Sequence, residues 1–337
     1  AELTVAAGLA RGLMELAVSK GASAAALAQR SGIEPADLAD QDHRVPFAAY
    51  VALMRAAKAL TGDEALALHY GETNDLAQIS VVGLIGYACE TMLDAFAQLN
   101  RYGRLVVEFD GPADRFKLAA KAGGHWVVDT REHANDFPEL TESTFARMVC
   151  GPRRFGVMRL AEAVHVTHPA PTYRSEYERI FQAPVVFGAE WNAVMMDPAW
   201  ATHRIAQQPR YVFGVLNERA DALLKALEAS KTTQGRVEAL LLPMLHTGQA
   251  SIATVAARMG VSRQTLYRRL RREGVTFETV LDRLRRRMAL DYIRANKVSL
   301  NETAYLVGFS DPAAFSRAFK RWTGVTPRSA RTAPPAG

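Results

Sequence analysis

Two stretches near the end of the chain repeat one pattern at an offset of 48 residues. Residues 251–262 and 299–310 both begin and end with serine, share an alanine at the sixth position, and carry a glycine, Gly260 or Gly308, at the tenth. Serine is a favoured N-terminal cap of a helix, and glycine adopts the left-handed backbone that ends one. Each stretch therefore predicts a helix, a turn and the start of a second helix, so the chain holds two helix-turn-helix units in tandem.

The second helix of each unit has one narrow apolar stripe. Leu266 and Leu270 lie four residues apart after the first turn, and Phe315, Phe319 and Trp322 follow the second turn at helical spacing. A stripe of this kind buries one face of a helix and leaves the opposite face polar. Such a helix suits the major groove of DNA.

The segment between the two units predicts a linker helix. Thr276 is expected to cap this helix, which then runs to about residue 295. A helix of about 20 residues is about 30 Å long, and successive major grooves on one face of DNA are about 34 Å apart. We therefore expect the two second helices to enter adjacent grooves. Upstream of the repeat, residues 236–246 predict another helix with a kink at Pro243.

Charge separates this C-terminal part from the rest of the chain. Residues 251–337 contain 17 lysines and arginines against 6 acidic residues, whereas residues 1–250 contain 24 against 29. A basic segment attached to a mildly acidic remainder indicates a region that binds a polyanion. A solvated basic surface is the alternative, but the spacing of the two helices favours DNA.

Several protein classes lack their usual signals here. No apolar run reaches the roughly 18 residues of a membrane span, and charged residues interrupt the first 20 residues, unlike a secretory signal. The two cysteines form no CxxC pair, which argues against a disulfide framework or a cysteine metal site. These features predict a cytoplasmic protein that makes no membrane contact.

No motif indicates an enzyme, a cofactor or a metal site. The chain has neither a GxxxxGK[ST] loop nor a strand-bound GxGxxG, and neither cysteine lies in a nucleophile motif. His165 and His168 are three residues apart on a predicted strand, so their side chains point to opposite faces and make a poor metal pair.

Residues 1–210 mix helical and strand-like periodicity. Residues 21–38 have the outline of a further helix-turn-helix, but acidic residues surround its second helix and would repel phosphates, so we interpret it as a structural pair. Further helices are expected at 45–60, 91–101 and 138–160, and strands at 105–109, 115–119, 126–129, 163–167 and 185–187. Short strands joined by tight turns favour an antiparallel sheet, and the helices give this part an α+β class.

Residues 211–229 predict a long helix with a heptad seam, followed by a polar linker at 230–235. A dimerisation helix is one interpretation, and packing on its own domain is the other. The domains predicted from these patterns are 1–210, 211–235 and 236–334. The seam residues are Phe213, Leu216, Ala220, Leu223 and Leu227.

Residues 251–331 resemble the DNA-binding domain of AraC/XylS-type transcriptional regulators. The resemblance is carried by Gly-Phe-Ser-Asp-Pro at 308–312, Phe-Ser-Arg-Ala-Phe-Lys-Arg at 315–321 and Gly-Val-Thr-Pro at 324–327. It implies an all-α domain in which a linker helix joins two helix-turn-helix units.

Residues 15–200 more loosely resemble the arabinose-binding-like sensor domain of one branch of that family. This resemblance is carried by residues 83–87, 99–105 and 187–189. It implies an α+β domain that senses an effector or dimerises, and it does not imply that arabinose is the ligand.

The resemblance implies that the exposed side of the first recognition helix reads bases, here through Gln264, Tyr267 and Arg268. Glutamine pairs with adenine and arginine with guanine, and each good pair contributes about 1–3 kcal/mol of discrimination. In the second unit, Arg317 is the evident base reader and Ala313 suits a thymine methyl group. We therefore expect the first unit to dominate sequence choice and the second to add mainly affinity.

Arg269 and Arg272 suit phosphate contacts better than base contacts. The full set expected to contact DNA is Ser262, Arg263, Gln264, Thr265, Tyr267, Arg268, Arg269, Arg271, Arg272, Ala313, Ser316, Arg317, Lys320 and Arg321.

Two functional hypotheses share this DNA-binding domain. In the first, the N-terminal domain of a homodimeric regulator binds a small-molecule effector, and the family resemblance adds RNA polymerase as a partner. In the second, that domain is a ligand-free dimerisation or protein-interaction platform. An apolar cavity with a few convergent polar groups favours the first hypothesis, and a filled core favours the second.

Overall fold

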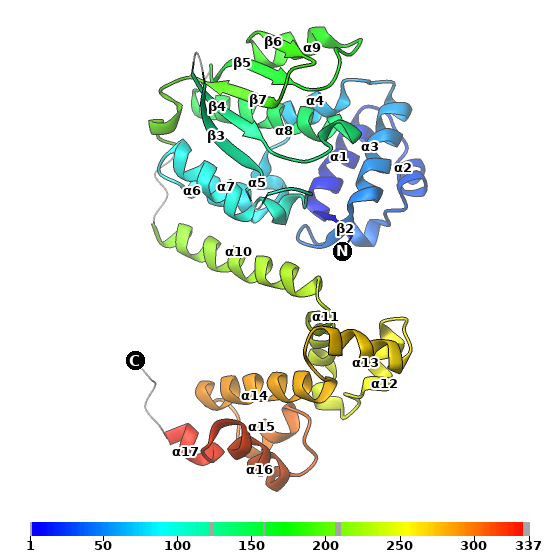
Figure 1. Cartoon of the computed structure of the whole chain (residues 1–337), viewed down its shortest axis with the longest axis vertical. Coiled ribbons are helices and arrows are strands. Elements are labelled where there is room, and N and C mark those ends of the chain that lie inside the picture. Colours follow the sequence, from blue (N-terminus) through cyan, green and yellow to red (C-terminus); the bar gives the residue numbers. More distant parts are fainter. Residues whose placement is uncertain (1, 113, 122–123, 158, 206–209, 333–337) are drawn as a thin grey trace. The chain divides into compact units, whose positions relative to one another are not determined.

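A computed structural model describes residues 2–112, 114–121, 124–157, 159–205 and 210–332. The chain forms two compact units, Ala1–Leu224 and Lys225–Gly337 (Figure 1). The predicted class is confirmed, because the first unit contains a five-stranded sheet with helices and the second is entirely helical within the described residues.

Short helices form most of the first 90 residues. Gly32 and Gly62 end two of them in the left-handed conformation, with φ of 71° and 68°. The second helix of the helix-turn-helix-like segment is only a four-residue 3-10 turn, η1. The elements are β1 (Thr4–Ala6), α1 (Ala7–Ser19), α2 (Ala24–Ser31), η1 (Pro35–Leu38), β2 (Arg44–Pro46), α3 (Phe47–Thr61), α4 (Leu66–Thr73), α5 (Leu76–Ile79) and α6 (Val81–Ala88).

The small ribbon that β1 and β2 form was not predicted from the sequence. These two strands pair in antiparallel register over three residues each, too few to show an alternating pattern. The side chain of Arg44 donates hydrogen bonds to the carbonyl oxygens of Thr4 and Arg104 at 2.9 and 3.2 Å. A long-range contact therefore fixes the ribbon more than its local sequence does.

The five-stranded sheet of the first unit has the order β3-β4-β7-β5-β6. Its strand pairs are antiparallel, except that β5 and β6 pair in parallel. The crossover helix α9 connects these two strands along the chain. The elements are α7 (Met92–Val106), β3 (Phe116–Lys121), β4 (Gly124–Asp129), η2 (Ala134–Asp136), α8 (Pro138–Cys150), η3 (Gly151–Phe155), β5 (Ala161–Val166), α9 (Arg174–Phe181), β6 (Val185–Phe187), β7 (Asn192–Met196) and η4 (Trp200–Thr202).

The strand predicted at 105–109 is wrong. Helix α7 begins at the cap Thr91 and continues to Val106, so Leu105 and Val106 are buried as helical residues. Val107 makes only an isolated bridge with Val5. The apolar run at 105–107 gives no period of its own, and the amphipathic helix before it decides its conformation.

Helix α8 forms the centre of the first unit's core. Phe145, Ala146 and Val149 pack in one cluster with Val127, Val164 and other inward-facing residues of the sheet. Helix α8 also lies against α4, where a Cβ at Gly71 would come within 2.2 Å of the carbonyl oxygen of Ser143. Only glycine permits this close approach of two helix backbones.

Helix α10 (Arg210–Ser230) and the following corner link the sequences of the two units. The predicted linker at 230–235 contains the short corner between α10 and α11, and Thr232 caps α11 by accepting a bond from the amide of Gly235. Pro243 marks the predicted break, where α11 (Thr233–Leu241) gives way to the 3-10 turn η5 (Leu242–Thr247).

The second unit contains the two predicted helix-turn-helix units. The first comprises α12 (Ile252–Arg258) and α13 (Arg263–Arg272), and the second comprises α15 (Leu300–Leu306) and α16 (Pro312–Thr323). The linker helix α14 (Phe277–Ala295) is capped by Thr276 as predicted, and α17 (Pro327–Thr332) ends the described chain.

Helix α14 contributes to the cores of both helix-turn-helix units. Its first half, with Phe277 and Leu284, packs around Leu266 and Leu270 of α13. Its second half, with Ile293, packs around Phe315 and Phe319 of α16, as the predicted apolar stripes require. One rigid helix thus positions both units.

Arg285 of α14 contacts the turn of the second helix-turn-helix. Its guanidinium donates hydrogen bonds to the carbonyl oxygens of Val307 and Gly308, at 3.1 and 3.2 Å, and lies over the ring of Phe309. These contacts hold the turn of the second helix-turn-helix against the linker helix. The burial of Arg285 lowers the pKa of its guanidinium.

Candidate nucleic-acid interface and ligand cavity

The exposed side of α13 carries the predicted base readers. The Ser262 hydroxyl accepts a hydrogen bond from the Thr265 amide at 3.1 Å and so caps this helix. Arg263, Gln264 and Arg268 are exposed on its surface. Because Leu266 and Leu270 are fully buried on the opposite side, the helix presents these polar groups outward.

Tyr267 and Arg271 of α13 contact each other. The Arg271 Nε donates a hydrogen bond to the Tyr267 hydroxyl at 3.0 Å, and the Tyr267 side chain is 47% exposed. The pair therefore forms one polar and aromatic ridge on the helix. Arg269 and Arg272, predicted to contact phosphates, are also exposed.

Helix α16 presents a less charged surface than α13. Ala313, Ser316 and Lys320 are exposed, and Arg317 lies 3.9 Å from Asp311 at the start of the helix. Arg321 is paired with Asp282 of α14 at 2.9 Å. Arg317 and Arg321 thus each lie near a carboxylate of the second unit.

Helix α14 has a basic face that is not among the predicted DNA contacts. Arg283, Arg286 and Arg294 are exposed and line a shallow groove together with Arg287. Arg287 also bonds to Glu238 of α11 at 3.2 Å. The sequence shows this run of arginines, but the same helix also carries an apolar stripe, which indicates packing and not DNA contact.

The predicted seam on α10 is only partly available to a partner. Ala220 and Leu227 are buried, whereas Phe213, Leu216 and Leu223 are partly exposed.

Part of α10 packs on its own unit. The hydroxyl of Tyr102 donates to Asp221 at 2.7 Å, and Arg219 pairs with Asp42 at 2.9 Å. Apolar residues that the analysis did not single out are exposed on this helix, namely Tyr211, Val212 and Val215.

The first unit encloses a cavity of about 210 Å³. Its walls come from α6, α7, α8, η3 and the first strand of the sheet, and most of its lining side chains are apolar. Residues 83–87 and 99–105, which carry the resemblance to a sensor domain, supply Gly83, Tyr87 and Leu99 to this lining. Two of the three segments that carry the resemblance therefore line one cavity, and residues 187–189 do not.

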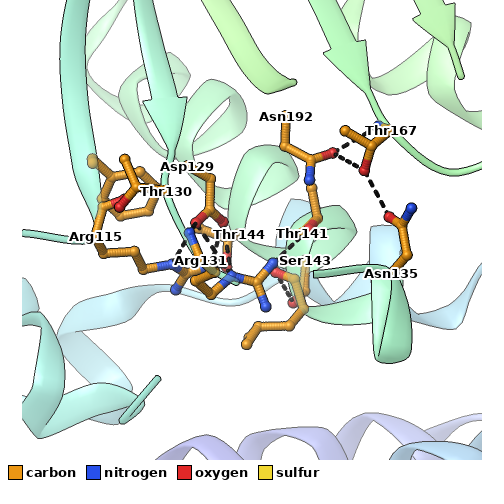
Figure 2. Close-up of polar contacts among 12 residues, drawn as sticks. Arg115, Asp129, Thr130, Arg131, Asn135, Thr141, Ser143, Thr144, Thr167 and Asn192 are labelled. Atoms are coloured by element: carbon orange, nitrogen blue, oxygen red, sulfur yellow. Dashed lines mark hydrogen bonds and ion pairs between the residues drawn. The ribbon is translucent and has the colours of Figure 1, made fainter. Parts of the chain in front are cut away.

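A buried charge network includes two residues of the cavity lining, Arg115 and Thr144 (Figure 2). Arg115 and Thr144 line the cavity and bond to each other at 3.1 Å. Behind them, Asp129 accepts bonds from Arg115 at 3.0 Å and from Arg131 at 2.9 Å, and its side chain is fully buried. Arg131 in turn donates to Thr141 at 2.6 Å.

The pKa values of this network reflect a competition between burial and charge. Burial alone raises the pKa of Asp129, but the charges of Arg115 and Arg131 outweigh it, and the pKa lies below its ordinary value. Burial, together with the neighbouring Arg115, lowers the pKa of Arg131 to about 10. Asp129 and Arg131 are therefore both charged at neutral pH.

His165 and His168 lie in different environments. The Trp191 Nε1 donates to His165 at 3.2 Å, whereas His168 is buried and lies 2.9 Å from the Tyr177 hydroxyl. The described residues contain no group of three or more metal-ligating side chains, and none of their helices has the length and apolarity to cross a membrane.

Two family models match the chain. The arabinose-binding domain of AraC transcription regulators, N-terminal, matches residues 21–205, and a helix-turn-helix domain matches residues 255–333.

Known proteins are similar over nearly the whole length. The ornithine utilization regulator of Pseudomonas aeruginosa is 28% identical, with 96% of this chain and 95% of that protein covered. VirS, a transcriptional regulator of Mycobacterium tuberculosis, is 26% identical, with 95% and 94% covered. The crystal structure of the regulator CdpR from Pseudomonas aeruginosa is 23% identical and aligns with a TM-score of 0.38 over 83% of this chain and 90% of that one.

Proposed function

The chain belongs to the AraC family of transcription regulators, and we propose that it binds DNA as an effector-responsive dimer that reads two successive major grooves per subunit. The tandem helix-turn-helix arrangement carries this proposal. Helices α13 and α16 expose polar surfaces, and the shared helix α14, at 19 residues, has nearly the length that adjacent grooves require. The proteins that this chain resembles are regulators of transcription, which are not enzymes.

Base reading is proposed for Gln264, Tyr267 and Arg268 of α13, with Arg263 and Arg271 beside them. The support is that all five are exposed on a helix whose opposite side is buried. In α16, Arg317 is the proposed base reader, and Ser316, Lys320 and Arg321 contribute affinity. Backbone contact is proposed for Ser262, which caps α13, and for Thr265, whose hydroxyl lies 2.9 Å from the Ser262 hydroxyl.

Replacing Arg268 with alanine is expected to reduce sequence discrimination by about 1–3 kcal/mol, because one bidentate base contact is lost. DNA sites would first be selected from a random pool, and binding to a selected site and its scrambled version would then be compared. Arg272→Ala is the matched control on the same helix. It should weaken binding to both sites equally. The slope of log binding constant against log salt concentration should fall by about one, the value for one lost phosphate contact.

Two results would contradict these assignments. If Arg268→Ala weakens both DNA sites equally, Arg268 holds phosphate and does not read a base. If Arg317→Ala changes sequence preference more than Arg268→Ala does, the second unit dominates sequence choice.

For the first unit, effector sensing is proposed over a ligand-free platform. The support is the largely apolar cavity with charged groups in its wall, a combination typical of small-molecule sites. An effector changes DNA binding only if it has different affinities for the DNA-competent and DNA-incompetent arrangements of the protein.

Dimerisation through α10 is proposed, but through a different face of the helix from the predicted heptad seam. Ala220 and Leu227 are already buried, so a partner would contact the more exposed Tyr211, Val212 and Val215 together with Leu216. Sedimentation equilibrium of Val215→Glu tests this face. The variant is expected to be monomeric at concentrations where the parent protein is dimeric, because a charge would enter an apolar interface.

A further inference from the structure

Two helices beside the cavity contain glycines that packing does not require. Gly86 of α6 and Gly103 of α7 both line the cavity, and a Cβ added at either position would meet no atom of the described residues within 4 Å. Gly83 of α6 differs, because a Cβ there would lie 2.2 Å from the backbone of Leu76. Glycine inside a helix is less stable than alanine in the same place. The missing side chains at Gly86 and Gly103 therefore cost stability and leave space open at the cavity wall.

Aromatic side chains form much of the remaining wall. Tyr87 meets Phe155 edge to face, with ring centroids 4.9 Å apart, and Phe96 meets Trp200 in the same way at 5.7 Å. Two further rings of the lining are Phe109 and Phe116. Aromatic rings attract one another in edge-to-face and offset arrangements, in addition to the effect of burying their area. The wall therefore favours an aromatic ligand over a saturated ligand with the same skeleton.

The polar side chains of the wall are largely engaged within the protein. Asp75 pairs with Arg154 at 2.8 Å, and the side-chain amide of Asn100 exchanges two hydrogen bonds with the backbone of β3. The buried polar atoms of the wall that lack a partner among the described residues have almost no accessible surface, so a ligand does not reach them. They are Oδ1 of Asn74, Nε and Nη2 of Arg147, and Nε1 of Trp200. A sugar would therefore lose hydrogen bonds to water that this wall does not replace.

The volume of the cavity sets the size of its ligand. An apolar cavity of about 150 Å³ binds benzene, and this cavity is larger, at about 210 Å³. A second ring fused to the first uses the additional space.

From these observations we infer that the cavity binds a flat, apolar molecule of two fused aromatic rings, which lies in the space left open by Gly86 and Gly103. This inference rests on the proposed function only in assuming that the cavity is the effector site. It adds the chemical class of the effector and the two positions whose lack of a side chain admits it.

Thermal unfolding and calorimetric titration of the full-length protein test the inference. The probes are indole, quinoline and 2-naphthol. Decahydro-2-naphthol, which has the skeleton of 2-naphthol without its aromatic rings, and D-arabinose are the comparison compounds. At least one aromatic probe is expected to bind and to raise the melting temperature. We expect 2-naphthol to bind at least about three-fold more tightly than decahydro-2-naphthol, and arabinose not to bind.

Substitutions of the two glycines test where the probe lies. Gly86→Leu and Gly103→Leu place a side chain in the open space, and each should bind the tightest probe at least about ten-fold more weakly. Ala97→Leu is the matched control, because it adds the same side chain to an exposed position of α7 outside the cavity lining. This control should retain binding. Ligand-free Gly86→Ala and Gly103→Ala should melt at the same temperature as the parent or higher, because a Cβ has room at both positions.

Four results would overturn the inference: aromatic probes that do not bind, decahydro-2-naphthol or arabinose binding as tightly as 2-naphthol, leucine variants that keep binding, or an Ala97→Leu variant that loses it. A marked fall in the melting temperature of the alanine variants would also overturn it, since packing would then require glycine. Where leucine prevents folding, the double alanine variant takes its place and must weaken binding.

DNA binding to selected and scrambled sites is measured in parallel, with and without the probes. If the aromatic probes fail while discrimination between those sites persists, the DNA-binding function stands and only the ligand assignment fails.

Discussion

Replacing Asp129 with alanine is expected to destabilise the N-terminal unit by about 3–5 kcal/mol, which is typical of breaking a buried ion pair from one side. The Asp129 side chain is fully buried between Arg115 and Arg131, whose side chains are only 10% and 6% exposed. Removing the carboxylate leaves two guanidinium groups facing each other without a counter-charge. Urea unfolding measured by tryptophan fluorescence tests this, since Trp126, Trp191 and Trp200 all belong to this unit.

Two controls separate charge from size. Asp129→Asn keeps the volume and one acceptor oxygen, and we expect it to lose most of the same stability. Glu162→Ala removes an exposed carboxylate from β5 of the same sheet and should change stability by no more than about 0.5 kcal/mol. Full stability in Asp129→Asn would mean that packing, and not charge, makes Asp129 important.

The same network predicts a pH dependence. The folded-state pKa of Asp129 lies below its unfolded value of about 3.9. A depressed carboxyl pKa contributes stability fully above the unfolded pKa, and this stability is lost as the pH falls through the folded pKa. The stability difference between the parent and Asp129→Asn should therefore be constant near neutral pH and shrink in acid.

Replacing Gly308 with alanine is expected to destabilise the second helix-turn-helix by about 2–5 kcal/mol and to weaken DNA binding. Gly308 has a φ of 84°, in the left-handed region, and an added Cβ would lie 2.5 Å from the carbonyl oxygen of Leu245. That oxygen belongs to the backbone of η5, so it cannot move aside as a flexible side chain would. The turn would have to move away from η5 and from Arg285.

The internal repeat provides the matched control. Gly260 occupies the equivalent turn of the first unit with a φ of 66°, but a Cβ there would meet nothing within 4 Å. Gly260→Ala should therefore lower the free energy of unfolding by only about 1–2 kcal/mol, which is the cost of placing a non-glycine residue in the left-handed conformation. Hydrogen exchange measured by mass spectrometry tests this. The exchange of α15 and α16 in Gly308→Ala is compared with the exchange of α12 and α13 in Gly260→Ala. Equal increases in exchange would show that the contact with Leu245 carries no strain.

The elements predicted most accurately are those with strong local signals. Ser262 and Thr276 cap the helices they were expected to cap, and the stripes at Leu266–Leu270 and Phe315–Phe319 are buried. Each of these features depends on residues within one or two helical turns, so periodicity and capping chemistry reveal them directly.

The features that the sequence did not reveal depend on distant partners. β7 is the central strand of the sheet, between β4 and β5, yet its five residues Asn192–Met196 show no alternation. Asp129 looks like the end of a strand until Arg115 and Arg131 are placed beside it. Arg147 is likewise one arginine among 41 basic residues until its surroundings show that its Nε and Nη2 atoms are buried without a hydrogen-bond partner.

The sequence by itself determined that this chain carries two helix-turn-helix units on a linker helix, because caps, turn glycines and apolar stripes are local and are repeated. The tertiary structure alone decided which glycine of the repeat is tightly enclosed, how the ion network of the first unit is arranged, and where a cavity lies. These properties arise from packing between segments far apart in the chain, and no pattern within a single segment records which neighbours it will meet.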